Sequence, residues 1–505
     1  MENKGRIINF RPLVFVGLIL IIGILISSLT IFYNSTYTII LFCLLFLSFI
    51  WLSFYLLKSK NYKTFITVCV SLLVLLVGVF SFFNVKAIAD NSNYSSDAFI
   101  SGYVVEVKEN NSNGYQIVVE GELDGKLNKI LLNVSAEFNV YVGSKVEFNG
   151  DIYKIDYNSN DVNLYPLINN QYFAATNINN FKVYAEFNSV SSRLKYIIIS
   201  RLKSYMPNGY GFSYALLVGD TSYLSSDSLS GFRYTGVAHI FAVSGLHVGF
   251  LYAFLSLIFK FLKVKSKTSS FIILFLIFLY VWFCGFSASC LRAFIIISIN
   301  LLSKILDFKY DKISALFLSA IIVLFINPFY LFDLGFLLSY FAYSSIVLLT
   351  KPTTKFFERF LPSKVAVYLA PYFAVYLGIL PISLTSFGYY SAFSMFFNMI
   401  IVPIISIVFI LNLFAVFGLL ITPYLSFLCV LPELCFILIT KFITSINYFA
   451  FLLTDINLGI SAIFYYMMLV FMLEEINISK KIRKNILLSL LFVFIVSVFV
   501  INLGN

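Results

Sequence analysis

The sequence predicts an α-helical polytopic membrane protein that carries one small β-barrel domain near its N-terminus. Hydrophobic residues fill 60% of the 505 positions and charged residues only 12%, which is more apolar surface than a soluble core of this length needs. Apolar runs of about 20 residues, long enough to cross about 30 Å of hydrocarbon, recur along the chain. A single long polar stretch interrupts them and alternates in hydrophobicity as strands do.

Three apolar runs open the chain, from Pro12 to Phe32, Tyr37 to Leu57 and Thr64 to Phe83. Each is long enough for a transmembrane helix, so residues 1–83 are predicted to form three spans. Lys and Arg cluster before the first run and again between the second and third. By the positive-inside rule both clusters face the cytoplasm, which places the N-terminus inside and the following polar stretch outside.

Residues 84–191 are predicted to form an extracytoplasmic, OB-like β-barrel domain, because short alternating segments punctuated by Gly and Asn are typical of strands in such barrels. The predicted strands are Phe99 to Val107, Tyr115 to Glu122, Lys129 to Val134, Ser144 to Asp156, and Phe181 to Ala185. Seven Lys against thirteen Asp or Glu give this stretch a net charge of −6. Because that charge repels phosphate, two interpretations stay open: base stacking on Tyr103, Tyr115 or Tyr153, and a structural or partner-docking role.

The rest of the chain is predicted to be mostly transmembrane. Apolar and basic positions alternate with helical period from Ser192 to Met206, which predicts an amphipathic helix at the membrane surface. About ten apolar segments follow, and we expect about 10 to 13 transmembrane or re-entrant helices in all. Several are expected to be interrupted by Pro328, Pro371, Pro381, Pro403 or Pro432. The predicted divisions are residues 192–212 (interfacial helix), 213–420 (central transmembrane domain) and 421–505 (C-terminal helices).

The basic character of the chain does not by itself indicate nucleic-acid binding. The whole chain carries a formal charge of +11, so everything outside the acidic polar stretch carries +17. Most of this charge lies in short connections between apolar segments, as the positive-inside rule produces in any membrane protein. All six cysteines fall inside apolar segments, which indicates neither a disulfide framework nor a zinc site.

The segment from Gly219 to Leu251 holds both histidines of the chain, His239 and His247. On one continuous helix they would lie about 12 Å apart along the axis, too far to share a metal ion. A break at Ser244 and Gly245 could bring them together, but zinc would still need a third ligand. No metal or cofactor is expected, and polar contacts in a pore or helix junction are the favoured role.

Charged residues within apolar segments need partners or an aqueous cavity. They are Arg233, Arg292, Asp333, Glu433 and Lys441. One interpretation is that these charges only fix helix register, with Arg292 paired to Asp333. In the other, Arg233 and Arg292 face water and suit a polyanion.

Four sequence motifs in order resemble the ComEC-type competence family of DNA-internalisation proteins. The first runs from Gly219-Asp220 through Phe232-Arg233, Gly236 and His239 to AVSGLHVG (Ala242 to Gly249). The others are CGFSASCLRA (Cys284 to Ala293), NPFYLFDLGFLLSY (Asn327 to Tyr340) and GILPISLTSFGYYSAFSMFFNMIIVP (Gly378 to Pro403). The resemblance covers the chain from Tyr210 to Leu420.

The resemblance implies a channel in the bacterial cytoplasmic membrane through which a single DNA strand enters during natural transformation. The implied pore or DNA-path residues are Asp220, Arg233, His239, Ser244, His247, Arg292 and Asp333. The implied structural residues are Gly219, Gly236, Gly245, Gly249, Gly285, Asn327, Pro328, Gly335, Pro381, Gly388, Asn398 and Pro403. Besides DNA and the lipid bilayer, the partners to consider are an extracytoplasmic DNA receptor, a separate nuclease, a cytoplasmic translocase and further copies of the chain.

Many members of that family end in a metallo-β-lactamase-like domain. A protein with two histidines cannot hold its HxHxDH motif, so this chain is expected not to be an enzyme. Two alternatives remain: a small-solute or lipid transporter, and a membrane-embedded enzyme that uses Asp220, His239 and His247.

Overall fold

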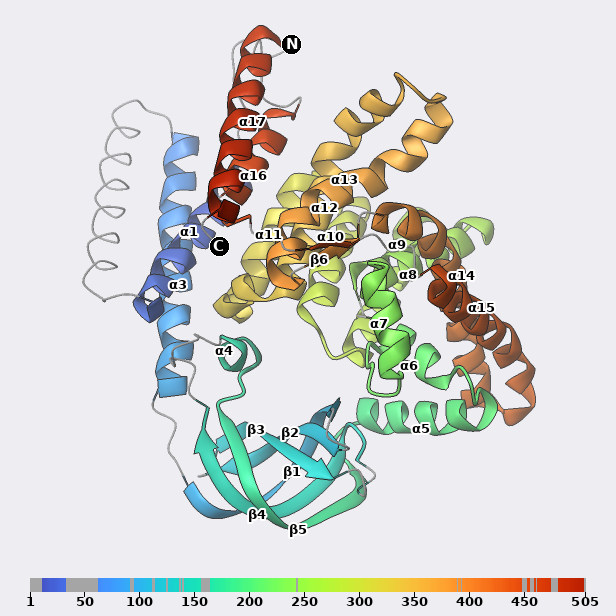
Figure 1. The fold of residues 1–505 in the computed structure, drawn as a ribbon. Helices are drawn as coiled ribbons and strands as arrows, with labels where there is room; N and C mark the ends of the chain where they lie inside the picture. The colour runs from blue at the N-terminus through green and yellow to red at the C-terminus, as the bar shows by residue number, and fades with distance from the viewer. Residues whose placement is uncertain are drawn as a thin grey trace.

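The protein is a bundle of helices with a small β-barrel at one end (Figure 1). The computed structural model describes residues 11–32, 62–90, 95–110, 114–123, 126–135, 138, 140–155, 164–241, 244–387, 389–391, 393–446, 452–454, 458–459, 461–473 and 480–503. The predicted second span, Tyr37 to Leu57, lies outside these residues.

Two long helices, α1 (Pro12–Phe32) and α3 (Tyr62–Asp90), form the N-terminal part of the bundle. The other described helices are α4 (Tyr165–Asn169), α5 (Val190–Tyr205), α6 (Tyr210–Val218), α7 (Ser226–Tyr234), α8 (Gly245–Phe261), α9 (Ser266–Phe283), α10 (Ala288–Ile305), α11 (Lys312–Ile326), α12 (Leu334–Phe357), α13 (Ser363–Phe387), α14 (Ser394–Ile421), α15 (Val430–Ile446), α16 (Ser461–Phe471) and α17 (Lys480–Leu503). Short 3-10 helices occur at η1 (Ala238–Ile240), η2 (Pro328–Phe332) and η3 (Pro423–Cys429), and β6 (Tyr389–Ser391) pairs with β7 (Leu452–Thr454).

Within the described residues, eight helical segments are long and apolar enough to cross a membrane: α1, α3, α9, α10, α12, α13, α14, and η3 joined to α15 (Pro423–Ser445). Three shorter apolar helices, α8, α11 and α16, pack among them. Large apolar side chains on the outside of these helices are exposed, as expected where lipid is the solvent. The predicted polytopic helical fold is confirmed, and the chain is a multi-pass membrane protein.

The polar stretch forms a closed five-stranded barrel, as predicted. Its strands are β1 (Ser95–Asn110), β2 (Gly114–Leu123), β3 (Lys126–Ser135), β4 (Ser144–Lys154) and β5 (Phe173–Phe187). They pair in the order β1-β2-β3-β5-β4, and β4 closes back onto β1. The pairs are antiparallel except for β3 with β5. Along β4 buried and partly exposed side chains alternate, so the barrel interior is a packed core.

Strand β5 begins eight residues before the predicted start at Phe181. Asn177 and Asn180 have positive φ angles, and the register between β4 and β5 shifts around them. Such irregularities are β-bulges, which interrupt the two-residue alternation while the strand continues. The sequence segment therefore resembles a loop although it is paired along its length.

A buried asparagine joins the barrel domain to the bundle. The Asn327 amide nitrogen donates to the carbonyl oxygens of Leu167 and Ile168 in α4, at 3.2 and 3.0 Å. The Asn327 side-chain oxygen accepts from the backbone N–H of Phe329 and so caps η2. One side chain thus satisfies backbone groups on both sides of the junction, and Figure 1 shows α4 between the barrel and the bundle.

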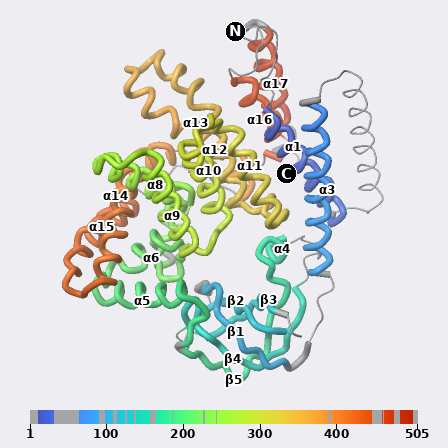
Figure 2. Tube along the Cα trace, turned by 180° about the vertical axis from the view of Figure 1, so that it is seen from behind, coloured from blue at the N-terminus to red at the C-terminus, as the bar shows by residue number. Residues whose placement is uncertain are grey.

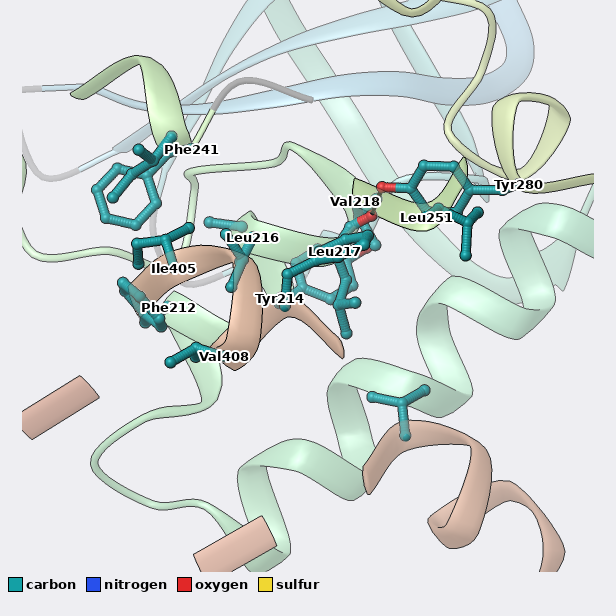
Figure 3. Close-up of a cluster of buried hydrophobic side chains, with 14 of the residues drawn as sticks. Phe212, Tyr214, Leu216, Leu217, Val218, Phe241, Leu251, Tyr280, Ile405 and Val408 are labelled. Atoms are coloured by element: carbon teal, nitrogen blue, oxygen red, sulfur yellow. Dashed lines mark hydrogen bonds between the residues drawn. The ribbon is translucent and has the colours of Figure 1, made fainter. Parts of the chain in front are cut away.

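The helix predicted from Ser192 to Met206 is present as α5, which lies crosswise to the longer helices beside the barrel (Figures 1 and 2). Its buried face is formed by Ile198, Ile199 and Leu202. The next helix, α6, is buried along almost its entire length and lies at the centre of the largest hydrophobic cluster. In Figure 3 its side chains pack against Phe241, Leu251 and Tyr280 and against Ile405 and Val408 of α14.

The predicted helix interruptions at Pro371, Pro381 and Pro403 are wrong, because α13 and α14 continue through these residues. Each proline removes the hydrogen bond to the carbonyl four residues earlier. For Pro381 that carbonyl belongs to Leu377, and the Tyr465 hydroxyl of α16 donates to it at 2.8 Å.

For Pro403 the carbonyl belongs to Met399, and the Tyr368 hydroxyl of α13 donates to it at 3.0 Å. Tyrosine hydroxyls from neighbouring helices therefore replace two bonds that proline removes. Substitution of this kind is what allows proline inside a transmembrane helix.

We expect Tyr465→Phe to lower the melting temperature of the purified protein in detergent, because the Leu377 carbonyl loses its donor. The loss corresponds to about 0.5–2 kcal/mol, the range for interhelical hydrogen bonds in membrane proteins. Tyr424→Phe is the matched control, since Tyr424 has an exposed fraction of 91%. Equal melting temperatures for the two variants would contradict this role of Tyr465.

Candidate functional site

The segment after α6 ties the bundle to the barrel through Asp220 and Ser222. Gly219 ends α6 with φ of 85°. The Asp220 carboxylate accepts from the backbone N–H of Ser222, and the Ser222 hydroxyl contacts both that carboxylate and the Val107 carbonyl of β1. Burial raises the pKa of Asp220, while the Ser222 hydrogen bonds and nearby Lys195 oppose the rise. Asp220 therefore lies at the joint between bundle and barrel.

Arg233 and His239 lie in exposed positions, on the last turn of α7 and in η1. Between them, Gly236 has φ of 75°, and a Cβ atom there would lie 2.6 Å from the Cβ of Ser394 at the start of α14. The Asn398 amide donates to the Gly236 carbonyl. These contacts fasten the loop to α14, as expected for structural motif residues.

Ser244 and His247 form a reciprocal cap at the start of α8. The Ser244 hydroxyl accepts from the Leu246 N–H at 3.3 Å, and His247 Nδ1 accepts from the Ser244 N–H at 3.2 Å. The neutral imidazole therefore carries its proton on Nε2. His247 is fully buried against Phe409, and its Nε2 has no hydrogen-bond partner among the described residues.

No metal centre forms around the histidines in the part of the chain that the structure describes. No three His, Cys, Asp or Glu side chains gather there closely enough to hold an ion. The Asp220 carboxylate is instead engaged with Ser222, and His247 serves as a helix cap.

Arg292, in the second turn of α10, is the most deeply buried charge of the motif region, with an exposed fraction of 7%. Its Nη1 donates to the Ser339 carbonyl of α12 at 2.8 Å. The guanidinium carbon lies 5.6 and 5.7 Å from the ring centroids of Tyr340 and Tyr343, within cation–π range. Its Nε has no hydrogen-bond partner among the residues that the structure describes.

The predicted pair of Arg292 with Asp333 does not form. Asp333 caps α12 instead, and its Oδ2 accepts from the Phe336 N–H at 2.7 Å. Among the described residues, Arg292 makes no ion pair with any carboxylate. Two other charged residues in apolar segments have environments unlike that of Arg292. Glu433 accepts from the Asn208 N–H at 2.9 Å, and Lys441 is exposed on α15.

The remaining motif residues have mostly local structural roles. Gly285 has a positive φ, Pro328 begins η2, and a Cβ at Gly335 would lie 3.0 Å from Asp333 Oδ2. A Cβ at Gly245 would lie 2.4 Å from Arg292 Nη2, whereas one at Gly249 would meet nothing within 4 Å. Gly388 lies outside the described residues.

Sequence reasoning missed the tyrosines that surround the basic side chains. Tyr340 and Tyr343 flank Arg292, and their three-residue spacing on α12 could have indicated a shared helix face. Another group surrounds the Lys203 ammonium of α5, which lies 5.0 to 5.7 Å from the ring centres of Tyr141, Tyr210 and Tyr223. No spacing signal identifies this second group, since its members come from separate segments.

The fold and site define a multi-pass membrane protein whose bundle encloses an uncompensated cation near an attached β-barrel. Residues 216–476, just over half of the chain, match the competence protein family, and the chain belongs to this family. It is similar to ComE operon protein 3 of Bacillus subtilis (strain 168), at 32% identity over 232 residues. That similarity spans 46% of this chain and 29% of the Bacillus protein. No solved structure matches significantly.

Gly236→Ala should destabilise the protein, because an L-residue at this φ is strained and its Cβ would overlap Ser394. A loss of about 1–2 kcal/mol is expected from the backbone strain alone. Gly249→Ala should leave stability unchanged or raise it slightly, since alanine favours a helix interior. Thermal unfolding in detergent measures both variants, and a stable Gly236→Ala protein would contradict the packing described.

Proposed function

We propose that the protein conducts a single strand of DNA across the bacterial cytoplasmic membrane. Membership of the competence protein family supports a role in DNA uptake. In this proposal the N-terminus is cytoplasmic and the barrel faces outward, in agreement with the positive-inside distribution of Lys and Arg.

The main support for the proposal is that Arg292 is buried and forms no ion pair with a carboxylate among the described residues. A charge at membrane depth is costly and is normally paired or faces an aqueous path. Arg292 is held by Tyr340, Tyr343 and one carbonyl, none of which neutralises its charge. A net positive interior favours an anionic substrate over a neutral or cationic one.

Unpaired polar atoms on three packed helices support the same conclusion. His247 Nε2 on α8, Arg292 Nε on α10 and both amide atoms of Asn412 on α14 are buried without hydrogen-bond partners among the described residues. Helix α8 contacts both α10 and α14. Buried unpaired groups cost about 1–3 kcal/mol each, so such a group of them indicates a region that water or substrate fills during transport.

DNA uptake into a competent bacterium that lacks its own family member tests the proposal. Complementation with wild type should restore import of labelled DNA, whereas Arg292→Gln should reduce it at least about tenfold, since a charged hydrogen-bonding group is lost. The control is Arg359→Gln, which removes an exposed cation from the chain. Protein levels are matched by immunoblot.

The outcomes separate the candidate functions. Restored import with wild type and with Arg359→Gln, but not with Arg292→Gln, supports the channel and its interior cation. Failure of the wild type to restore import contradicts the channel and moves the small-solute or lipid transporter ahead. Normal import with Arg292→Gln contradicts the role of the interior cation.

A further inference from the structure

The guanidinium of Arg292 presents one free edge. Of its five N–H donors, the described contacts use one, from Nη1 to the Ser339 carbonyl. Nε and Nη2 lie along the opposite edge, and no hydrogen bond from either is formed among the described residues. This is the edge through which arginine binds carboxylate or phosphate with two parallel bonds.

The free edge faces the N-terminus of α8. Nη2 lies so close to Gly245, the first residue of that helix, that a Cβ atom there would come within 2.4 Å of it. Helix α8 is 17 residues long, so the partial positive charge at its N-terminus is well developed. Glycine at position 245 is therefore what allows the cation to approach the helix end.

This arrangement brings two positive groups together with nothing to neutralise them. The α8 N-terminus favours anions, and a cation beside it is unfavourable unless an anion lies between or next to them. Ser244 caps only part of the helix end: it accepts from the backbone N–H groups of Leu246 and His247, and the Gly245 N–H has no hydrogen-bond partner among the described residues. No described carboxylate reaches the guanidinium.

We propose that the Nε–Nη2 edge of Arg292 and the N-terminus of α8 form a binding site for one phosphodiester group. The Nε–Nη2 edge of a guanidinium can donate two parallel hydrogen bonds, one to each of two phosphate oxygens. Helix N-termini bind phosphate through backbone N–H groups. Tyr340 and Tyr343 lie with their ring centroids 5.6 and 5.7 Å from the guanidinium carbon, and neither forms a described hydrogen bond with this edge.

Arg292 lies four residues, or about 6 Å along the axis, from the start of α10. The connection that leads into α10 lies next to α5 and α6, since Cys284 contacts the Leu217 carbonyl and Lys195 lies over the Phe283 ring. The site is therefore one turn inside the bundle from its barrel side. A strand that enters past the barrel would meet it early, so the site deepens the proposed channel function and rests on it for its natural ligand.

Binding can be measured without transport, on the full chain purified in detergent, with dimethyl phosphate as the probe. At constant ionic strength, dimethyl phosphate should raise the melting temperature of the wild type saturably relative to chloride. Arg292→Lys should weaken the apparent affinity for dimethyl phosphate at least about tenfold, because lysine keeps the charge but cannot donate two parallel hydrogen bonds. Arg292→Gln should abolish the effect.

Glycine variants keep the test sound if the arginine variants fold poorly. Gly245→Ala should weaken dimethyl phosphate binding, since its Cβ displaces Nη2, while Gly249→Ala should bind as wild type does. The proposed site would be overturned if dimethyl phosphate did not stabilise the wild type. It would also be overturned if Arg292→Gln and Gly245→Ala were stabilised as much as the wild type.

The source of the phosphodiester is decided by competition. A short oligothymidylate that competes with dimethyl phosphate in wild type assigns the site to a DNA strand. Competition only by phosphatidylglycerol upholds the site, assigns it to a lipid headgroup and contradicts its place in a DNA path. If DNA import depends on Arg292 but dimethyl phosphate does not bind, the site fails while the channel proposal stands.

Discussion

The structure depends on one constraint: inside a membrane, each backbone N–H and carbonyl that a helix break exposes must find a partner within the protein. The motif residues largely meet this need. Ser244 with His247, Asn327 and Asp333 cap helices whose ends lie within the bundle or at its barrel side. Tyr465 and Tyr368 donate to carbonyls that Pro381 and Pro403 leave without a bond. Short helices such as α6 can therefore be buried within the protein, where α6 packs against α5, α14 and α15.

Arg292 does not follow this pattern of buried polar groups that find partners. The neighbouring motif residues complete their own backbone, whereas Arg292 is buried with its charge unpaired and one edge of its guanidinium free. Keeping such a group is costly, and function is the usual reason for keeping it. Gly245 has a physical role here, because any side chain would push the cation away from the start of α8. The motif residues are thus of two kinds: those that complete backbone hydrogen bonds, and Gly245 with Arg292, which lie against each other without a described hydrogen bond between them.

The sequence predicts the barrel, the helix from Ser192 to Met206 and the helical membrane fold, because alternating hydrophobicity follows the two faces of a strand and the length of an apolar run follows membrane thickness. It failed where a partner distant in sequence decides the outcome. Prolines 381 and 403 indicated helix breaks because the tyrosines that replace the missing bonds lie 84 and 35 residues away in the chain. One interpretation of the sequence pairs Arg292 with Asp333, but Asp333 caps α12 and two tyrosines flank the arginine. Local sequence could not show which of these residues meet in the fold.

The central claim is that a translocating strand passes the α8 N-terminus and Arg292, and photo-crosslinking tests it most directly. A benzophenone amino acid at position 343 would lie beside the guanidinium, and one at position 417 would lie on the exposed face of α14, where Phe417 has an exposed fraction of 65%. Illumination of cells during DNA uptake should yield covalent DNA adducts at position 343 and none at 417. Adducts absent from position 343 while import proceeds, or equally frequent at both positions, would contradict the account.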